Sequence, residues 1–177
     1  MIPAARRLEL LFLAALPGLI ATALAIFSLS CKHISGLSHF MPALPLIPIF
    51  YWGLTHSRDM PYWFVFALGL VTDAVTGLNL GLSSLLYMLF LKLLHMQRRY
   101  IHKEGFIVKW MYFAALLAVT DFLGGIAQSF FSPGSVHFGP AFLQWLLTVC
   151  FYPVLHKAFD GLDDYIHSRR WQILHGG

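Results

Sequence analysis

The sequence has few charged residues. Only 11% of its 177 residues are Asp, Glu, Lys or Arg, while 58% are hydrophobic and the mean hydropathy is +0.69. Soluble domains are about a quarter charged. A small soluble domain also leaves much of its chain in contact with water, so it cannot hide this much apolar surface. The composition therefore excludes a soluble globule and predicts an integral membrane protein.

The chain also lacks the motifs of common enzyme classes. It contains no G-x-x-x-x-G-K-[ST], no H-E-x-x-H and no G-x-S-x-G sequence, and its length leaves no room for a separate catalytic domain. No two of the nine histidines have metal-ligand spacing on one helix face near a carboxylate. Cys31 and Cys150 are predicted to lie too far apart in depth for a disulfide. We expect no enzyme activity, no cofactor, no metal ion and no nucleic-acid partner.

Six apolar runs predict an all-α bundle of six transmembrane helices in one membrane domain, residues 1–177. The runs cover about 8–29, 41–55, 62–80, 82–96, 108–131 and 141–156. The first is too long for the core of a cleaved signal and has no A-x-A site, so we expect an anchoring helix. The second run carries Pro42, Pro45 and Pro48 and is expected to be kinked, partly broken or re-entrant.

The positions of the basic residues predict the orientation. With a cytoplasmic N-terminus and six crossings, ten of the twelve Lys and Arg residues fall on the inner side. This topology places both termini in the cytoplasm and explains the pI of about 9.2. The segment 157–177 would then be a cytoplasmic tail, either an amphipathic helix on the membrane surface or a frayed, solvated end.

Two acidic residues lie within the predicted spans. Asp73 in the third span and Asp121 in the fifth each belong to a row of small residues, a pattern that lets helices approach closely. A carboxylate in the membrane requires a reason. It is either a proton relay, ion site or ligand-cavity floor, or a protonated group that hydrogen-bonds a neighbouring helix; sparse polar surroundings favour the second. Lys92 either snorkels to the inner headgroups, which we favour, or pairs with one of these acids.

Two stretches of the sequence carry recognisable motifs. The first is a proline-bearing second span that ends in a Tyr-Trp pair and includes Pro45, Pro48 and Trp52. The second is a Gly-Leu-x-x-Asp-x-x-x-Gly-x-x-x-Gly run whose motif residues are Gly69, Asp73, Gly77 and Gly81. Together these stretches resemble the rod shape-determining protein MreD family. Asp121 matches no family motif, so its interpretation rests on the physical argument alone. All eight residues are candidates for helix packing or partner binding.

The resemblance implies a function. MreD proteins are non-enzymatic parts of the cell-elongation machinery for peptidoglycan synthesis in the bacterial inner membrane. They associate with the transmembrane helix of MreC, and through MreC with MreB, with the glycosyltransferase RodA and with a class B penicillin-binding transpeptidase. The resemblance also implies a fold similar to the substrate-binding subunit of energy-coupling-factor transporters.

That fold similarity raises an alternative function, a small-molecule-binding subunit of a transporter. A subunit of this kind would carry polar, ligand-facing groups near its outer mouth. The predicted outer loops offer only a sparse set, which favours the scaffold: Lys32, His33, His39, Asn79 and His137.

Overall fold

The computed structural model describes residues 4–32, 42–55, 60–76, 81–131 and 138–175, with side chains in the first and last helices described for 15–30, 139–166 and 168. Gly77 and the predicted outer-loop segments 33–41, 77–80 and 132–137 lie outside the described residues. The described ranges form six helices and no strand, as expected for the all-α class. The helices are α1 (Ala4–Lys32), α2 (Leu46–Thr55), α3 (Tyr62–Thr76), α4 (Leu82–Ile101), α5 (Phe106–Phe131) and α6 (Phe138–His175).

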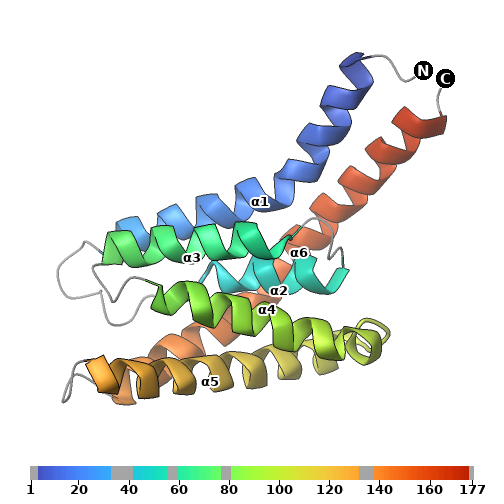
Figure 1. Cartoon of the computed structure of the whole chain (residues 1–177). Helices are drawn as coiled ribbons and strands as arrows, with labels where there is room; N and C mark the ends of the chain where they lie inside the picture. Colours follow the sequence, from blue (N-terminus) through green and yellow to red (C-terminus); the bar gives the residue numbers. More distant parts are fainter. Residues whose placement is uncertain (1–3, 33–41, 56–59, 77–80, 132–137, 176–177) are drawn as a thin grey trace.

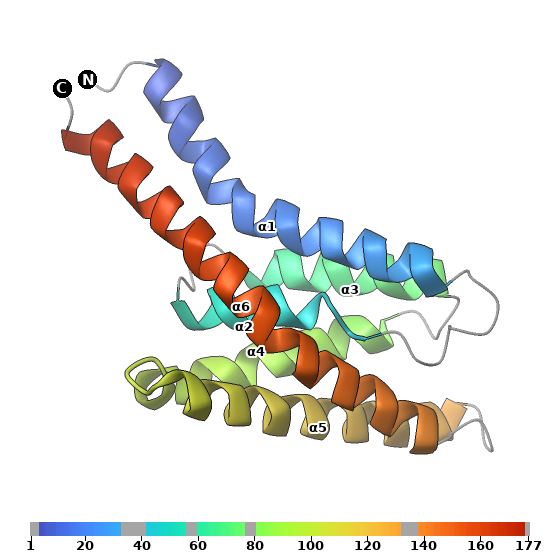
Figure 2. The same cartoon turned by 180° about the vertical axis from the view of Figure 1, so that it is seen from behind.

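Successive helices run in opposite directions along the bundle, and the start of α1 lies near the end of α6 (Figure 1). In Figure 1 α1, α3 and α5 run one way while α2, α4 and α6 run back. The start of α1 and the end of α6 extend side by side beyond the other helices (Figures 1 and 2). An even number of alternating helices brings both ends of the chain to the same end of the bundle.

The shortest helix, α2, occupies the middle of the bundle. All residues from Leu46 to Leu54 are buried. The predicted second span is longer than this helix because residues 42–45 form turns before it begins. Side chains of the flanking helices satisfy this irregular backbone: Ser28 donates to the Pro42 carbonyl at 3.1 Å, and Thr148 accepts from the Ala43 nitrogen at 2.9 Å. Pro48 lies in the first turn of α2, where a backbone N–H has no partner within the helix, so it removes no internal hydrogen bond.

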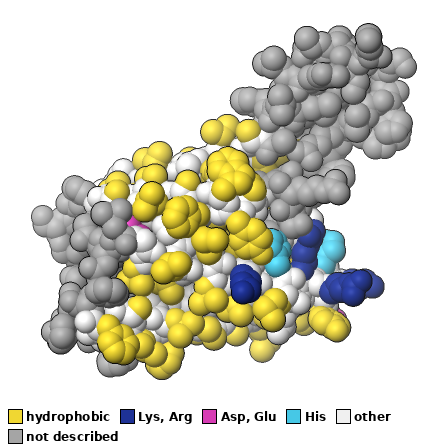
Figure 3. All heavy atoms as spheres, in the orientation of Figure 1, with side chains coloured by type: hydrophobic (Ala, Val, Ile, Leu, Met, Phe, Trp, Pro, Cys, Tyr) yellow, Lys and Arg dark blue, Asp and Glu magenta, His cyan; other side chains and the backbone are white. Residues whose placement is uncertain are grey.

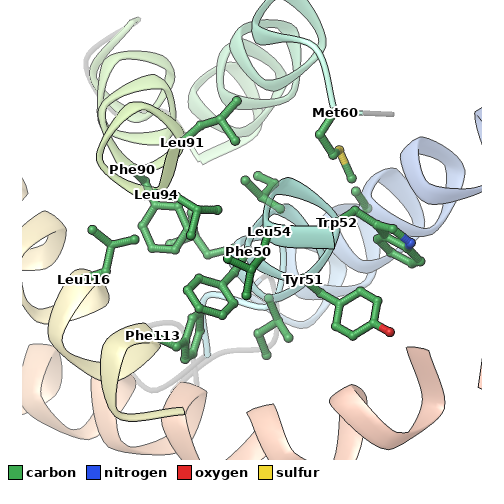
Figure 4. Packing of buried hydrophobic residues seen from close by; sticks show 14 of the residues in the cluster. Phe50, Tyr51, Trp52, Leu54, Met60, Phe90, Leu91, Leu94, Phe113 and Leu116 are labelled. Atoms are coloured by element: carbon green, nitrogen blue, oxygen red, sulfur yellow. The ribbon is translucent and has the colours of Figure 1, made fainter. Parts of the chain in front are cut away.

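Aromatic side chains of α2 join it to the surrounding helices. The Phe50 ring lies 5.1 Å from Phe113 of α5 and 5.6 Å from Tyr152 of α6, measured between ring centroids. Figure 4 shows Phe50, Tyr51 and Trp52 pointing away from α2 in different directions. Trp52 packs on Phe159 of α6 at 4.7 Å. Because aromatic pairs carry large buried areas and directional preferences, α2 fixes the positions of its neighbours.

The helices differ in how well each could cross a bilayer alone. Within the described residues one helical stretch, Phe106–Phe130 of α5, is both long and apolar enough. Shorter apolar stretches lie in three other helices: Ala15–Ser30, Leu46–Thr55 and Tyr62–Thr76. The last helix, α6, has 38 residues, so the predicted tail continues it as far as His175. The first helix bends visibly along its length (Figures 1 and 2) and contains Pro17, which interrupts its hydrogen-bond ladder.

Apolar side chains cover the outside of the bundle, and several polar ones are enclosed. Figure 3 shows hydrophobic side chains spread over the visible face, with few charges between them. Large apolar side chains are exposed on several helices, among them Trp63 at 72%, Phe122 at 65% and Val154 at 66%. Asp73, Ser84 and Thr148 are, in contrast, completely buried. The core itself is apolar, but this many large apolar side chains on the outside are unusual for a water-soluble protein.

Candidate functional site

The buried carboxylate of Asp73 binds the beginning of the next helix. Asp73 lies in the last turn of α3 and accepts hydrogen bonds from the backbone nitrogens of Gly81 at 2.9 Å and Ser83 at 3.1 Å. The N-cap position of α4 is Gly81, which has no side chain with which to cap it. A helix N-terminus leaves its first N–H groups without partners and carries a partial positive charge. Asp73 therefore supplies from α3 the cap that α4 itself lacks.

Gly69 allows the two helices to come this close. A Cβ atom at Gly69 would lie 2.4 Å from Cα and 2.7 Å from the backbone nitrogen of Ser84. These are backbone atoms, so no side-chain rotation relieves the contact. Gly69 and Asp73 are one turn apart, and both contact the first turn of α4. Gly81 adds a left-handed φ of 97°, which glycine adopts without strain.

These contacts specify how Asp73 acts in packing. The sequence predicted a protonated carboxyl group that hydrogen-bonds a neighbouring helix. In the structure Asp73 does bind the neighbouring helix α4, but as an acceptor from backbone N–H groups. Both carboxylate oxygens act as acceptors, a role that needs no proton on the carboxyl group. The motif residues Gly69, Asp73 and Gly81 thus come together at one junction, between α3 and the start of α4.

The second acid, Asp121, has a different environment. It is half-buried on α5, and no described residue forms a hydrogen bond or ion pair with its carboxylate. Tyr87 of α4 lies within electrostatic reach of both Asp73 and Asp121, and its hydroxyl lies beside Thr72. Both acids follow a Val-Thr pair in the sequence, yet the two have different surroundings in the structure.

Lys92 lies on α4 with its side chain exposed. In the part of the chain that the structure describes, no ion pair joins Lys92 to either acid. Its predicted snorkelling to the inner headgroups stays a prediction.

Arg98, near the end of α4, also caps a helix other than its own. Its guanidinium donates from Nε to the Leu54 carbonyl at 2.7 Å and from Nη2 to the Thr55 carbonyl at 2.9 Å. These are the last two residues of α2, where free carbonyls and the negative end of the helix dipole attract a cation. Arg98 is one of the ten basic residues that the predicted topology places on the inner side, and nothing local in the sequence indicated its carbonyl partners.

A polar cluster at the same end of the bundle joins α2 to α6. The Tyr51 hydroxyl donates to Asp160 Oδ1 at 2.6 Å, and His156 Nδ1 lies 2.9 Å from Asp160 Oδ2. The Tyr51 ring also meets the His156 ring edge-on at 5.2 Å. The sequence showed Tyr51 only as part of the Tyr-Trp pair that ends the second span, and the cluster was missed. The signal available was the four-residue spacing of His156 and Asp160, which places them on one helix face.

The remaining candidate residues have packing positions. Pro45 lies in the turn before α2, Pro48 in its first turn, and Trp52 is fully buried against Phe159. Among the described residues, no group of three His, Cys, Asp or Glu side chains could hold a metal ion. The polar contacts of Asp73, Arg98 and Tyr51 each join one helix to another, which is what a helix-packing site requires.

The family model described as rod shape-determining protein MreD matches residues 7–160 of the chain. No curated protein and no solved structure matches the chain. The match covers all of α2 to α5 and includes the junction formed by Gly69, Asp73 and Gly81.

Proposed function

Because the chain belongs to the MreD family of rod shape-determining proteins, we propose that it is a non-enzymatic scaffold that binds the transmembrane helix of MreC in the bacterial inner membrane. Membership of this family implies a role in rod shape determination. Through MreC, the scaffold would connect to MreB, to RodA and to a class B penicillin-binding transpeptidase. The expected similarity to the substrate-binding subunit of energy-coupling-factor transporters stays a prediction.

The observation that carries the membrane proposal is the apolar exterior around enclosed polar contacts. Exposed side chains such as Phe122 and Trp63 would each cost free energy in water, at about 25 cal/mol per Å² of apolar surface. In hydrocarbon they cost nothing, whereas every backbone polar group must then be satisfied within the protein. The irregular residues 42–45 meet this condition, since Ser28 and Thr148 bind their backbone inside the bundle. We expect six crossings with both termini in the cytoplasm.

The scaffold proposal is supported by the way the helices are held. Helices in lipid associate through close packing and a few interhelical hydrogen bonds, because hydrocarbon provides no hydrophobic driving force between them. Gly69 and Asp73 supply both kinds of contact between α3 and α4. A rigid bundle of this kind can offer a fixed outer surface to the single helix of a partner.

Affinity purification from detergent tests the scaffold. The tagged protein is expected to bring down MreC, identified by mass spectrometry, and to restore rod shape in cells that lack the native gene. Asp73→Leu and Gly77→Leu are expected to reduce both. Gly161→Leu is the control, since a Cβ there would have no atom within 4 Å. Normal MreC recovery and normal cell shape with Gly77→Leu would count against the proposal.

Cysteine labelling from either side of the membrane tests the topology. Residues in the N-terminal and C-terminal segments are expected to react only from the cytoplasmic side. Labelling of the two termini from opposite sides would rule out six crossings. The sample from the affinity purification also tests the alternative function. A small molecule that copurifies in stoichiometric amount, without MreC, would favour a transporter subunit.

A further inference from the structure

Asp121 differs from Asp73 in having no donor within the described chain. It lies on α5, fifteen residues after Phe106 and ten before Phe131. At 1.5 Å of rise per residue, these intervals are about 22 Å and 15 Å along the helix axis. If α5 crosses the bilayer, lipid headgroups at its two ends are therefore too far away to reach the carboxylate. A cationic partner for the carboxylate would have to be a side chain at the same depth.

The backbone next to Asp121 is accessible on one side. A Cβ atom at Gly125, one turn further along α5, would have no atom within 4 Å. The adjacent Gly124 differs, because a Cβ there would lie 3.0 Å from Leu86 Cδ1 of α4. Helix α4 therefore covers Gly124 and leaves Gly125 uncovered. An uncovered glycine beside an acid is a position where a second helix backbone can approach closely.

We propose that Asp121 and Gly125 form a docking position on α5 for a partner transmembrane helix that carries a Lys or Arg opposite Asp121. The proposal rests on the proposed function and specifies where the partner helix binds. Charge complementarity identifies the occupant: a carboxylate in an apolar span is costly until a basic group reaches it. A metal ion does not fit, since the described residues offer no group of three ligands around Asp121.

The expected effect on binding follows from the strength of interhelical polar contacts. Such contacts in membranes contribute about 0.6 to 1.7 kcal/mol, which corresponds to roughly three- to twentyfold in affinity. Asp121→Asn is therefore expected to weaken MreC binding by about three- to tenfold. Gly125→Leu, which fills the open position, is expected to weaken binding at least as much. Both variants should unfold close to the temperature of the unmodified protein, because within the described residues Asp121 has no hydrogen bond or ion pair to lose, only the electrostatic proximity of Tyr87, and Gly125 has no contact.

Binding is measured with purified full-length MreC in detergent micelles, beside the thermal unfolding of each variant. Gly161→Leu is the matched control, since it makes the same change at another open glycine on α6. Asp121→Asn and Gly125→Leu binding MreC as tightly as the unmodified protein would overturn the docking position and leave the proposed function intact. No binding of MreC by the unmodified protein would instead overturn the proposed function. A large fall in unfolding temperature with Asp121→Asn would indicate an internal structural role and overturn the docking position.

Photo-crosslinking locates the partner helix independently. A photoreactive phenylalanine analogue replaces Phe122, which lies next to Asp121 and is exposed, or Phe66 on α3, which is also exposed. Crosslinks to MreC are expected from position 122 and not from position 66. Efficient crosslinks from 66 alone would place the partner near α3 and overturn the docking position.

Discussion

The carboxylate of Asp73 accepts a hydrogen bond at 2.9 Å from the backbone nitrogen of Gly81, the residue that caps α4. A glycine in this position gives the chain the left-handed turn it needs but no capping side chain. An acid eight residues earlier, on the preceding helix, supplies what the glycine cannot. Arg98 does the same for the last carbonyls of α2. In both places a side chain of another helix binds the backbone groups that a helix end leaves without partners.

Two replacements of Asp73 separate its contribution as a hydrogen-bond acceptor from the contribution of its side-chain shape. Asp73→Leu leaves the backbone N–H groups of Gly81 and Ser83 without their acceptor, and we expect a loss of about 2 to 4 kcal/mol of stability. Asp73→Asn keeps one acceptor oxygen and the shape of the side chain, so we expect a loss of only about 1 kcal/mol. Unfolding in detergent measures both, and hydrogen exchange at the two amides should rise more with Leu. Equal stability of the two variants would show that the cap contributes little.

Gly69 and Gly125 allow a comparison of the same substitution in two environments. Gly69→Ala places a methyl group 2.4 Å from the Cα atom of Ser84, so the helices must move apart, and we expect a loss of about 1 to 3 kcal/mol. Gly125→Ala meets no atom within 4 Å, and alanine is the better helix former by about 1 kcal/mol. We expect it to be neutral or slightly stabilising. A milder effect at Gly69 than at Gly125 would contradict the close approach of α3 and α4.

The sequence predicted the number and kind of elements because apolar runs of this length have one stable form in lipid. It also marked Gly69 and Asp73, since small residues with an acid at four-residue spacing share a helix face. The length of α2 was not predictable in the same way. Residues 42–45 lie outside the ten-residue helix, and Ser28 and Thr148 bind the backbone there from other helices, a contact that the local sequence does not reveal.

The partners of the charged groups were likewise hidden from the sequence. An acid in a span indicates that a partner exists, but the partners of Asp73, and those of Arg98 just beyond the predicted fourth span, are backbone atoms, which every residue carries. Composition and spacing cannot single them out. The Tyr51, His156 and Asp160 cluster depends on where α2 ends relative to α6, and helix register between distant segments is a property of packing.

Replacing Arg98 tests the cap on α2. Arg98→Met keeps the apolar stem and removes both donors, so the carbonyls of Leu54 and Thr55 lose charged partners, and we expect a loss of about 2 to 3 kcal/mol. Arg98→Lys keeps the charge but cannot reproduce the planar fork that serves two carbonyls, and its effect should be about half as large. Unfolding in detergent measures the stability of both variants. The neighbouring Arg99, whose side chain is exposed, supplies the control through Arg99→Met, which should leave stability unchanged within about 0.5 kcal/mol.

The contact between Tyr51 and Asp160 can be isolated with a double-mutant cycle. Tyr51→Phe removes the hydroxyl that donates to Asp160 at 2.6 Å, and Asp160→Asn removes the charge on its acceptor. A hydrogen bond to a charged group contributes about 1.5 to 3 kcal/mol when buried, and Asp160 is half exposed, so we expect a coupling energy of about 1 kcal/mol. The cycle measures unfolding of the four proteins under one condition. A coupling energy near zero would mean that the ring packing of Tyr51 on His156 and Phe159, rather than its hydroxyl, holds α2 to α6.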